Sequence, residues 1–319
     1  ADLARQYATY CRDHGDNKLY RIASGASDAD YKWTETLMQQ ISCFGCEATP
    51  KTFFQGLSVH YYTLAGPWEA KGSATGFDTD DYYRTMVSAR RIDRILTGHS
   101  TVMDVYDPHR TVGLVLDEWG TWWDVEPGTN PGFLFQQNTL RDALVASTHF
   151  DIFHKHAARL HMANIAQTVN VLQAMILTDG DSLVRTPTYH VFEMNKGHQD
   201  ATSLPVHVRA EGARRRVGDA ELDTLSASAS VKDGTVLISV SNLDADEPAD
   251  ILLDLRGGTL GDTTARILTA DRLQAHNTPE TTTTVAPREF DVPSVTENGL
   301  RLTLPPHSFV TVQAPLTQQ

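Results

Sequence analysis

The first 197 residues alternate between helical and extended patterns, and this alternation restricts the fold more than any other feature. Strands are predicted at 18–24, 56–63, 111–119 and 165–172. Helices are predicted at 2–14, 31–41, 80–95, 139–156 and 187–196. Each strand is followed by a helix at a spacing typical of α/β proteins. The near-continuous apolar run from Val112 to Leu116 is typical of a parallel strand that is covered on both faces.

Two α/β architectures fit this pattern, a doubly wound open sheet and a (β/α)8 barrel. No glycine-rich nucleotide-binding motif follows a predicted strand, which disfavours the first. Polar residues gather instead at the carboxyl ends of two strands: His60 and Tyr62 on one, Asp117 and Glu118 on the other. In barrels this rim carries the catalytic residues. Four strand–helix units make half of such a barrel, so the first half would be missing.

After about residue 203 the sequence changes to short segments of alternating polar and apolar residues, separated by turn signals such as Asp233-Gly234 and Gly257-Gly258. This spacing predicts an antiparallel β-sandwich. The predicted fold class is therefore α/β plus all-β: the second half of a (β/α)8 TIM barrel over residues 1–200, then a C-terminal β-sandwich over 201–319. Ala1 opens directly into a helical pattern without Met or signal peptide, so we expect a fragment.

The composition excludes several classes of function. Apolar residues make up 40% and charged residues 21% of the 319 residues, a globular profile without an apolar run long enough to cross a membrane. The net charge of −13 argues against nucleic acid as a partner, because binding phosphates needs clusters of Lys and Arg. Three cysteines do not describe a disulfide framework, and the lone Cys43-Phe-Gly-Cys46 motif lacks a second pair that would complete a zinc site.

The segment VLDEWGTWWD, residues 115–124, carries the sharpest chemical signal. An apolar strand ends in two acids and opens into three tryptophans, and sugar chemistry uses a carboxylate beside exposed indole rings. The alternative is a strand-end acid that caps a loop, with the tryptophans in the core. Asp117 and Glu118 should point to opposite sides of the strand, so that only one faces the barrel axis.

Two weaker signals accompany this segment. His60 and Tyr62 share one face of their strand, where they could bond a nucleophilic carboxylate and keep it ionised, unless they are packed core residues. Gln167 on the last predicted strand could bond sugar hydroxyls. His149, His154, His156 and His161 lack the spacing of a helical metal-binding pair, and we interpret them as surface or packing residues.

Together these segments resemble glycoside hydrolase family 51, the intracellular-type α-L-arabinofuranosidases. The resemblance covers almost the whole chain. It is carried by RIASG, LSVHYYT, VLDEWGTWWDVEPGTNPGFLFQQNTLRDALVAS, HMANIAQTVNVLQAM and RTPTYHVFEMNKGH, and in the predicted sandwich by AHNTPE and LPPHSFV. It implies net retention through a covalent glycosyl-enzyme intermediate on a barrel with a C-terminal sandwich.

The resemblance also implies a role for individual residues. Glu118, at the end of the seventh barrel strand, matches the nucleophile. Tyr62 and His60, at the end of the sixth, match its neighbours in the active site. Gln167, on the eighth, matches a sugar-binding glutamine, and Trp122 matches an aromatic residue that lines the substrate pocket.

The chain departs from the family pattern at one essential point. The family's general acid/base is a Glu in a Gly-Asn-Glu motif after the fourth strand, and that motif does not occur here. We expect the chain to begin just beyond it and to have little activity alone. Asp179 is the best substitute within the chain.

The resemblance further implies an arabinofuranosyl-containing saccharide as partner, no cofactor or metal, a cytoplasmic location and homo-oligomers of the full-length protein. An endo-acting β-glucanase or xyloglucanase and a non-catalytic carbohydrate-binding fragment stay open as alternatives.

Overall fold

The computed structural model describes residues 1–41, 53–209, 212–292, 295–296 and 299–317. The chain divides into two compact units. The parallel-sheet unit comprises residues 1–62, 91–119 and 156–165, and the sandwich unit comprises 63–90, 120–155 and 166–319. Strands β2 and β3 and helix α3 continue from one unit into the other.

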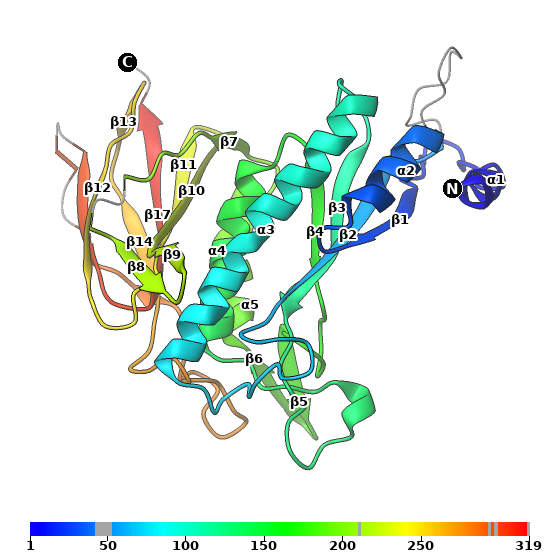
Figure 1. Cartoon of the computed structure of the whole chain (residues 1–319). Coiled ribbons are helices and arrows are strands. Elements are labelled where there is room, and N and C mark those ends of the chain that lie inside the picture. The colour runs from blue at the N-terminus through cyan, green and yellow to red at the C-terminus, as the bar shows by residue number, and fades with distance from the viewer. Residues whose placement is uncertain (42–52, 210–211, 293–294, 297–298, 318–319) are drawn as a thin grey trace. The chain divides into compact units, whose positions relative to one another are not determined.

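The parallel-sheet unit holds four strands in the order β1-β2-β3-β4 (Figure 1). β1 pairs with β2, and β3 with β4, in parallel. The elements that belong wholly or partly to this unit are α1 (Asp2–Ala8), β1 (Ile22–Ser27), α2 (Tyr31–Ile41), β2 (Gly56–Thr63), α3 (Thr79–Tyr106), β3 (Gly113–Thr121) and β4 (Leu160–Ile165). The sequence thus predicted the alternation of strands and helices, and β2 in full.

Several predicted elements differ from the structure. The helix expected at 2–14 ends at Ala8, and the strand expected at 18–24 lies at Ile22–Ser27. The strand expected at 165–172 lies earlier in the chain, as β4. Residues 166–172 form a loop instead, because Asn170 adopts a left-handed backbone conformation and its side chain bonds the backbone of Thr178. The helix expected to end near Ile95 continues to Tyr106. Gly98 does not end it but makes room for Tyr31, since a Cβ there would lie 2.4 Å from the tyrosine ring.

Buried polar contacts fix the strands of this unit. Gly25 donates its N–H to Ser58 Oγ at 2.9 Å where β1 steps out of register with β2. A Cβ at Gly25 would lie 1.6 Å from the Ser58 carbonyl oxygen, so only glycine allows the two backbones to approach this closely. At the start of β4 the buried Arg159 donates to Asp107 Oδ2 and to the Val112 carbonyl, both at 2.8 Å.

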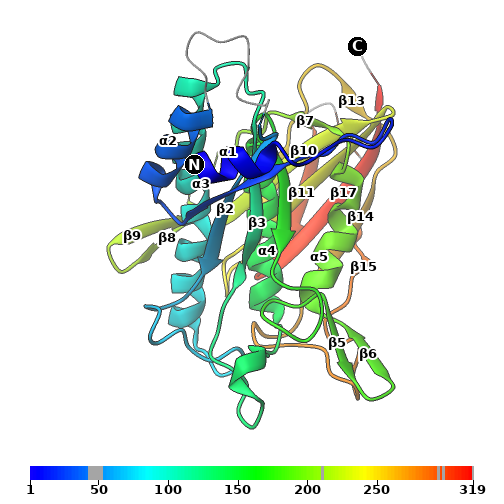
Figure 2. The ribbon, with the colours of Figure 1, turned by 90° about the vertical axis from the view of Figure 1, so that its right-hand side faces the viewer.

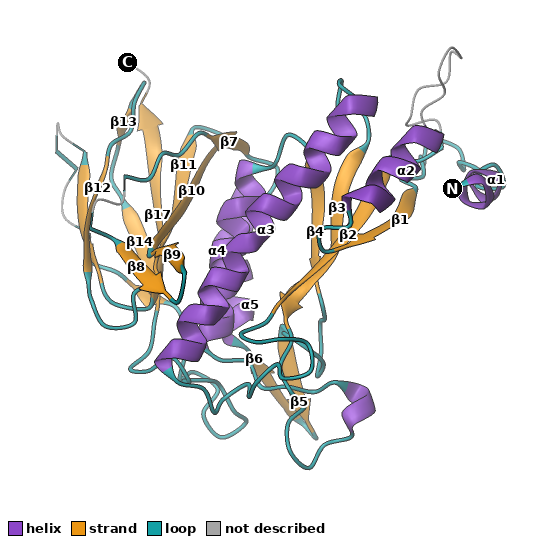
Figure 3. Cartoon of the chain, in the orientation of Figure 1, coloured by secondary structure: helices purple, strands orange, loops and turns teal. Residues whose placement is uncertain are grey.

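The sandwich unit contains the predicted antiparallel β-sandwich (Figure 3). Its larger sheet has the order β15-β14-β17-β11-β10-β7, with β13 pairing on β17, and β12 pairs with β16. Apolar side chains of β12 and β16 pack with those of β11 and β17 in one core. The strands are β7 (Thr202–Leu204), β8 (Arg214–Val217), β9 (Ala220–Asp223), β10 (Leu225–Lys232), β11 (Thr235–Asn242), β12 (Ala249–Leu253), β13 (Thr259–Leu260), β14 (Thr264–Leu268), β15 (Arg288–Glu289), β16 (Leu300–Leu304) and β17 (Ser308–Thr317).

The same unit holds helices α4 (Leu140–Lys155) and α5 (Pro187–Asn195), two 3-10 turns, η2 (Pro131–Phe133) and η3 (Lys196–His198), and a hairpin of β5 (Ile176–Asp179) and β6 (Ser182–Arg185). Figure 2 shows this hairpin projecting below α5. α4 packs against β10 and β11. The alternating serines of these two strands therefore face helices rather than water, and their hydroxyls are buried against helical side chains.

A polar cluster lies in this layer. Ser228 Oγ donates to Asp151 Oδ1 at 2.7 Å and lies 2.9 Å from His154 Nδ1. The His154 ring lies 4.4 Å from that of His198, whose two nitrogens contact the hydroxyls of Ser230 and Ser239. His154 and His198 are thus packing residues that bond to buried serines.

Replacing Gly25 should destabilise the sheet. Gly25→Ala forces a Cβ against the Ser58 backbone, and overpacking of this kind costs about 1–3 kcal/mol. Urea unfolding of the 319-residue chain measures the loss. Gly261→Ala is the matched control, because the nearest atom to its Cβ would lie at an ordinary 3.5 Å. Equal stability of the two variants would contradict the close approach.

The histidine pair predicts a loss of stability in acid. Burial lowers the pKa of His154 from 6.5 to about 4, and burial followed by repulsion from His154 lowers that of His198 to about 3. At a pH between these values and 6.5, the two histidines bind a proton in the unfolded chain but not in the folded chain. Each ring therefore lowers the free energy of unfolding by about 1.4 kcal/mol for every unit by which the pH falls. Asp151 opposes this trend, because burial raises its pKa to about 7 and the folded state alone keeps that proton.

Urea unfolding between about pH 4.5 and pH 7 measures this slope. His198→Gln should flatten it by about 1.4 kcal/mol per pH unit, the contribution of one proton. His109→Gln, at an exposed residue, should leave the slope as in the wild type. A slope unchanged in His198→Gln would rule out the assigned role of this ring.

Candidate active site

Three of the predicted site residues meet within the parallel-sheet unit. His60 and Tyr62 alternate along β2, and Glu118 lies on the neighbouring β3. Tyr62 donates its hydroxyl proton to Glu118 Oε2 at 2.8 Å, and His60 Nδ1 lies 3.5 Å from the same oxygen. Period-two alternation places both partners on the face of β2 that the sequence predicted.

The surroundings keep Tyr62 protonated. Burial, and then the nearby Glu118 carboxylate, raise the pKa of Tyr62 well above its ordinary value of 10. The phenol therefore keeps its proton and acts as a donor at any physiological pH. The Glu118 side chain is 45% exposed, so a small molecule in solution can reach the carboxylate while Tyr62 holds one of its oxygens.

Asp117 corrects the prediction that only one of the two acids faces the site. Asp117 Oδ1 lies 3.1 Å from His60 Nε2, so both carboxylates reach the same imidazole. The pairing of β3 with β4 is irregular at these two acids, because Leu116 pairs with Ala163 and Trp119 with Ile165. Three residues along β3 thus correspond to two along β4, so β3 carries one extra residue here. An extra residue of this kind, a β-bulge, changes the direction of neighbouring side chains.

The three tryptophans after Glu118 have different environments. Trp119 and Trp123 are buried, as the core alternative predicted for them. Trp122 is partly exposed and packs edge-on against Trp68, with 4.7 Å between ring centroids. The Lys71 ammonium lies 5.9 Å from the Trp122 ring. Of the three, Trp122 is therefore the ring that can offer a surface to a ligand.

A buried network that sequence reasoning missed supports the segment with Trp122. Asp142 accepts bonds from Thr121 Oγ1 at 2.6 Å, Trp123 Nε1 at 2.8 Å and the Thr139 N–H at 2.7 Å. The guanidinium of Arg141 lies 3.6 Å from the centre of the Trp123 ring. Asp142 and Arg141 stand in the sequence as ordinary helix residues, and only their burial would have revealed the network.

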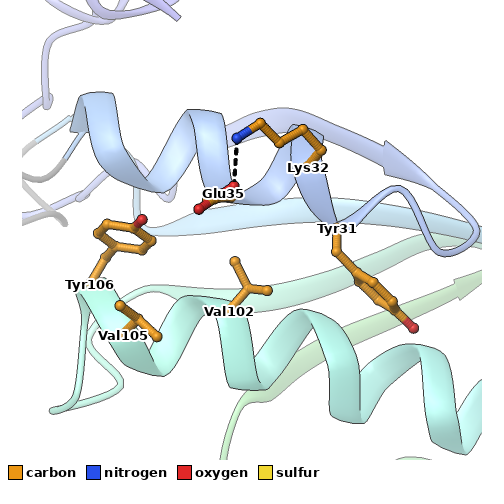
Figure 4. Close-up of a pocket in the computed structure, with 6 residues that line it drawn as sticks. All are labelled: Tyr31, Lys32, Glu35, Val102, Val105 and Tyr106. Carbon is orange, nitrogen blue, oxygen red and sulfur yellow. Dashed lines mark hydrogen bonds and ion pairs between the residues drawn. The ribbon is translucent and has the colours of Figure 1, made fainter.

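The remaining predicted residues lie elsewhere. Gln167 is exposed in the sandwich unit and follows a cis peptide bond after Ala166. Gln167 and Trp122 stay predictions as substrate contacts. The Cys43-Cys46 motif lies outside the described residues. A shallow hollow between α2 and α3 contains none of the predicted site residues (Figure 4). Its lining is formed by Tyr31, Lys32, Glu35, Val102, Val105 and Tyr106.

Comparison with known proteins identifies the family. The family model described as the α-L-arabinofuranosidase C-terminal domain matches residues 117–308, more than half of the chain. The crystal structure of the family 51 arabinofuranosidase from Xanthomonas axonopodis pv. citri superposes with a TM-score of 0.91 at 45% identity, over 98% of this chain and 62% of that one. This chain belongs to the family 51 arabinofuranosidases.

Other arabinofuranosidases are also similar to this chain. The intracellular exo-α-L-arabinofuranosidase of Bacteroides ovatus is 48% identical over 98% of this chain and 59% of its own length. The Thermotoga maritima enzyme, solved with arabinose, has the same fold with a TM-score of 0.77 at 23% identity, over 98% of this chain and 61% of its own. The chain therefore spans about three fifths of the length of these relatives. Within the described residues, no helix combines the length and apolar character needed to cross a membrane.

Removing the charge of Asp142 should loosen the segment that carries Trp122. Asp142→Asn presents an amide N–H to a set of buried donors, and each buried donor left unpaired costs about 1–3 kcal/mol. Urea unfolding and the intrinsic tryptophan fluorescence report the change. Asp124→Asn, at an exposed acid of the same segment, should be close to neutral. Wild-type stability of Asp142→Asn would show that the network is dispensable.

Proposed function

We propose that this chain supplies the nucleophile half of a retaining exo-α-L-arabinofuranosidase active site, with Glu118 as the nucleophile. The observation that carries the proposal is the 2.8 Å hydrogen bond from Tyr62 to Glu118 Oε2, with His60 Nδ1 at 3.5 Å from the same oxygen. A donor and an imidazole on one carboxylate oxygen stabilise its ionised form. The carboxylate is also exposed enough for a sugar to reach it.

The chemistry follows from this arrangement. A Glu118 oxygen attacks the anomeric carbon, the bond from that carbon to the leaving oxygen breaks, and its electron pair stays on the leaving group. Tyr62 holds Oε2 while the charge of the carboxylate is lost to the new ester bond. Water then attacks the same carbon from the face opposite the Glu118 ester and loses a proton to the solvent. The ester bond breaks, its electron pair returns to the Glu118 carboxylate, and arabinose leaves with net retention. Neither step calls for a metal or a cofactor.

The proposed substrate is a saccharide with terminal α-L-arabinofuranosyl residues. The name of the Bacteroides ovatus relative, an exo-acting arabinofuranosidase, supports this choice over an endo-acting glucanase or xyloglucanase. We propose Trp122 as an aromatic surface for the sugar and Gln167 as a partner for its hydroxyls. The word intracellular in the same name supports a cytoplasmic location, and an oligomeric full-length enzyme stays a prediction.

The proposed architecture is the second half of a (β/α)8 barrel over residues 1–200 and a sandwich domain over 201–319. The four-stranded sheet with its parallel pairs, and the TM-score of 0.91 to a family 51 arabinofuranosidase, support it. We assign no acid/base within these 319 residues, because no Gly-Asn-Glu motif occurs in them. Since proton donation contributes typically 10²–10⁴-fold, we expect slow hydrolysis of natural glycosides by this chain alone.

An activated substrate tests the nucleophile without an acid. In 2,4-dinitrophenyl α-L-arabinofuranoside the leaving phenolate departs without protonation, so attack by Glu118 should release about one equivalent of phenolate in a burst. Mass spectrometry of the intact chain should show one added arabinosyl group, and peptide mapping should locate it on Glu118. Glu118→Gln should abolish both the burst and the adduct.

Asp124→Asn is the matched control, because it removes an exposed acid six residues along the chain and should keep the burst. A burst that persists in Glu118→Gln, an adduct on another carboxylate, or no adduct on the wild-type chain would each refute the proposal. Hydrolysis of natural arabinosides by the wild-type chain at ordinary enzymatic rates would refute the expected need for a further acid.

A further inference from the structure

The β-bulge in β3 creates an arrangement that the proposed reaction does not use. Asp117 Oδ1 is shielded from solvent, accepts no hydrogen bond from the described residues, and lies at an ion-pair distance of 3.1 Å from His60 Nε2. Glu118 Oε2 lies 3.5 Å from His60 Nδ1, the other nitrogen of the ring. The imidazole therefore stands between two carboxylates that are adjacent in the sequence.

The chemistry of imidazole limits the states that fit here. A neutral ring has one N–H donor and one nitrogen lone pair, so one of the two carboxylates would face a lone pair. The imidazolium ion carries a positive charge, which lies 3.1 Å from one acid and 3.5 Å from the other. The geometry consequently favours the charged ring.

Few other charges act on this ring within the described residues. On β1, Ser27 pairs with His60, and the next residue, Asp28, donates its backbone N–H to the His60 carbonyl. The Asp28 carboxylate lies 3.5 Å from Arg91 of α3 and is balanced by it. On the strand of His60 itself, the nearby titratable group Tyr62 is a neutral phenol directed at Glu118. Asp117 is thus the counter-ion of His60 that does not take part in the proposed reaction.

We propose that Asp117 is a positioning residue, which holds His60 as an imidazolium with Nδ1 beside the Glu118 carboxylate. This inference rests on the proposed function, because it assigns His60 a task on the nucleophile. The task matters most when Glu118 is esterified. At that stage Glu118 carries no charge, and Asp117 is the remaining carboxylate beside the His60 ring. Asp117 keeps the ring charged and in place until water releases the sugar and the negative charge returns to Glu118.

The histidine ring itself provides the test. In the 319-residue chain labelled with ¹³C,¹⁵N-histidine, the His60 signals are identified as those missing from His60→Gln. We expect the wild-type ring to carry protons on both nitrogens at pH 7. In Asp117→Asn its titration midpoint should move to lower pH by about 0.5–1 unit, since loss of a close opposite charge disfavours the charged form.

Two variants complete the comparison. Asp117→Glu keeps the charge and should restore most of the wild-type midpoint. Glu35→Gln removes one acid that pairs with Lys32 on α2 and should leave His60 unchanged. A neutral His60 ring in the wild-type chain at pH 7 overturns the inference. So does a His60 titration midpoint that shifts in Asp117→Asn no more than it shifts in Glu35→Gln.

The kinetic consequence separates this inference from the proposed function. In Asp117→Asn the arabinosyl adduct should still form on Glu118 but should persist about tenfold longer, because about 1.4 kcal/mol of stabilisation is lost in the second step. An adduct that decays at the wild-type rate overturns the task assigned to Asp117 and leaves Glu118 as nucleophile. Absence of the adduct from the wild-type chain overturns the proposed function and leaves the charge state of His60 as a property of the fold.

Discussion

The hydrogen bond between Tyr62 and Glu118 joins two neighbouring strands near their carboxyl ends, and the candidate site depends on it. It forms only if β2 and β3 keep their register, because a slip of one strand by one residue would turn its side chain away from its partner on the other strand. The contact of Gly25 with Ser58 holds β1 against β2, and the buried Arg159 ties the start of β4 to the residues before β3. Polar contacts at a distance from Glu118 therefore hold the strands on either side of this bond in place.

The sequence contained enough information for the strands that carry the site and for the face on which His60 and Tyr62 lie. Strand β2 was predicted with its bounds, because its apolar and polar residues alternate cleanly between a loop and a turn. The sequence did not reveal that Asp117 contacts His60. A bulge arises from the pairing of two strands, and no local pattern in VLDEWG distinguishes a regular strand from one with an extra residue.

The errors elsewhere have the same origin. The segment 165–172 alternates like a strand, but the tertiary bonds of Asn170 to Thr178 make it a loop. Trp119 and Trp123 stand in an apparently open loop, yet Trp119 packs in the core and Trp123 is held beside Arg141 and Asp142. In each case a contact with residues outside the segment outweighs its local preference. Such contacts become visible only when the chain is folded.

The serine faces of β10 and β11 show how closely the sandwich is joined to the helices of its own unit. Their hydroxyls bond Asp151, His154, His198 and Ser147 rather than water or a saccharide. If the chain were cut at residue 200, these strands would lose the cover of α4 and α5 and expose a face that is flat, weakly polar and already arranged in strands. The sandwich is accordingly unsuited to being moved between proteins as an independent cassette, and family members would be expected to inherit it together with the helices that cover it.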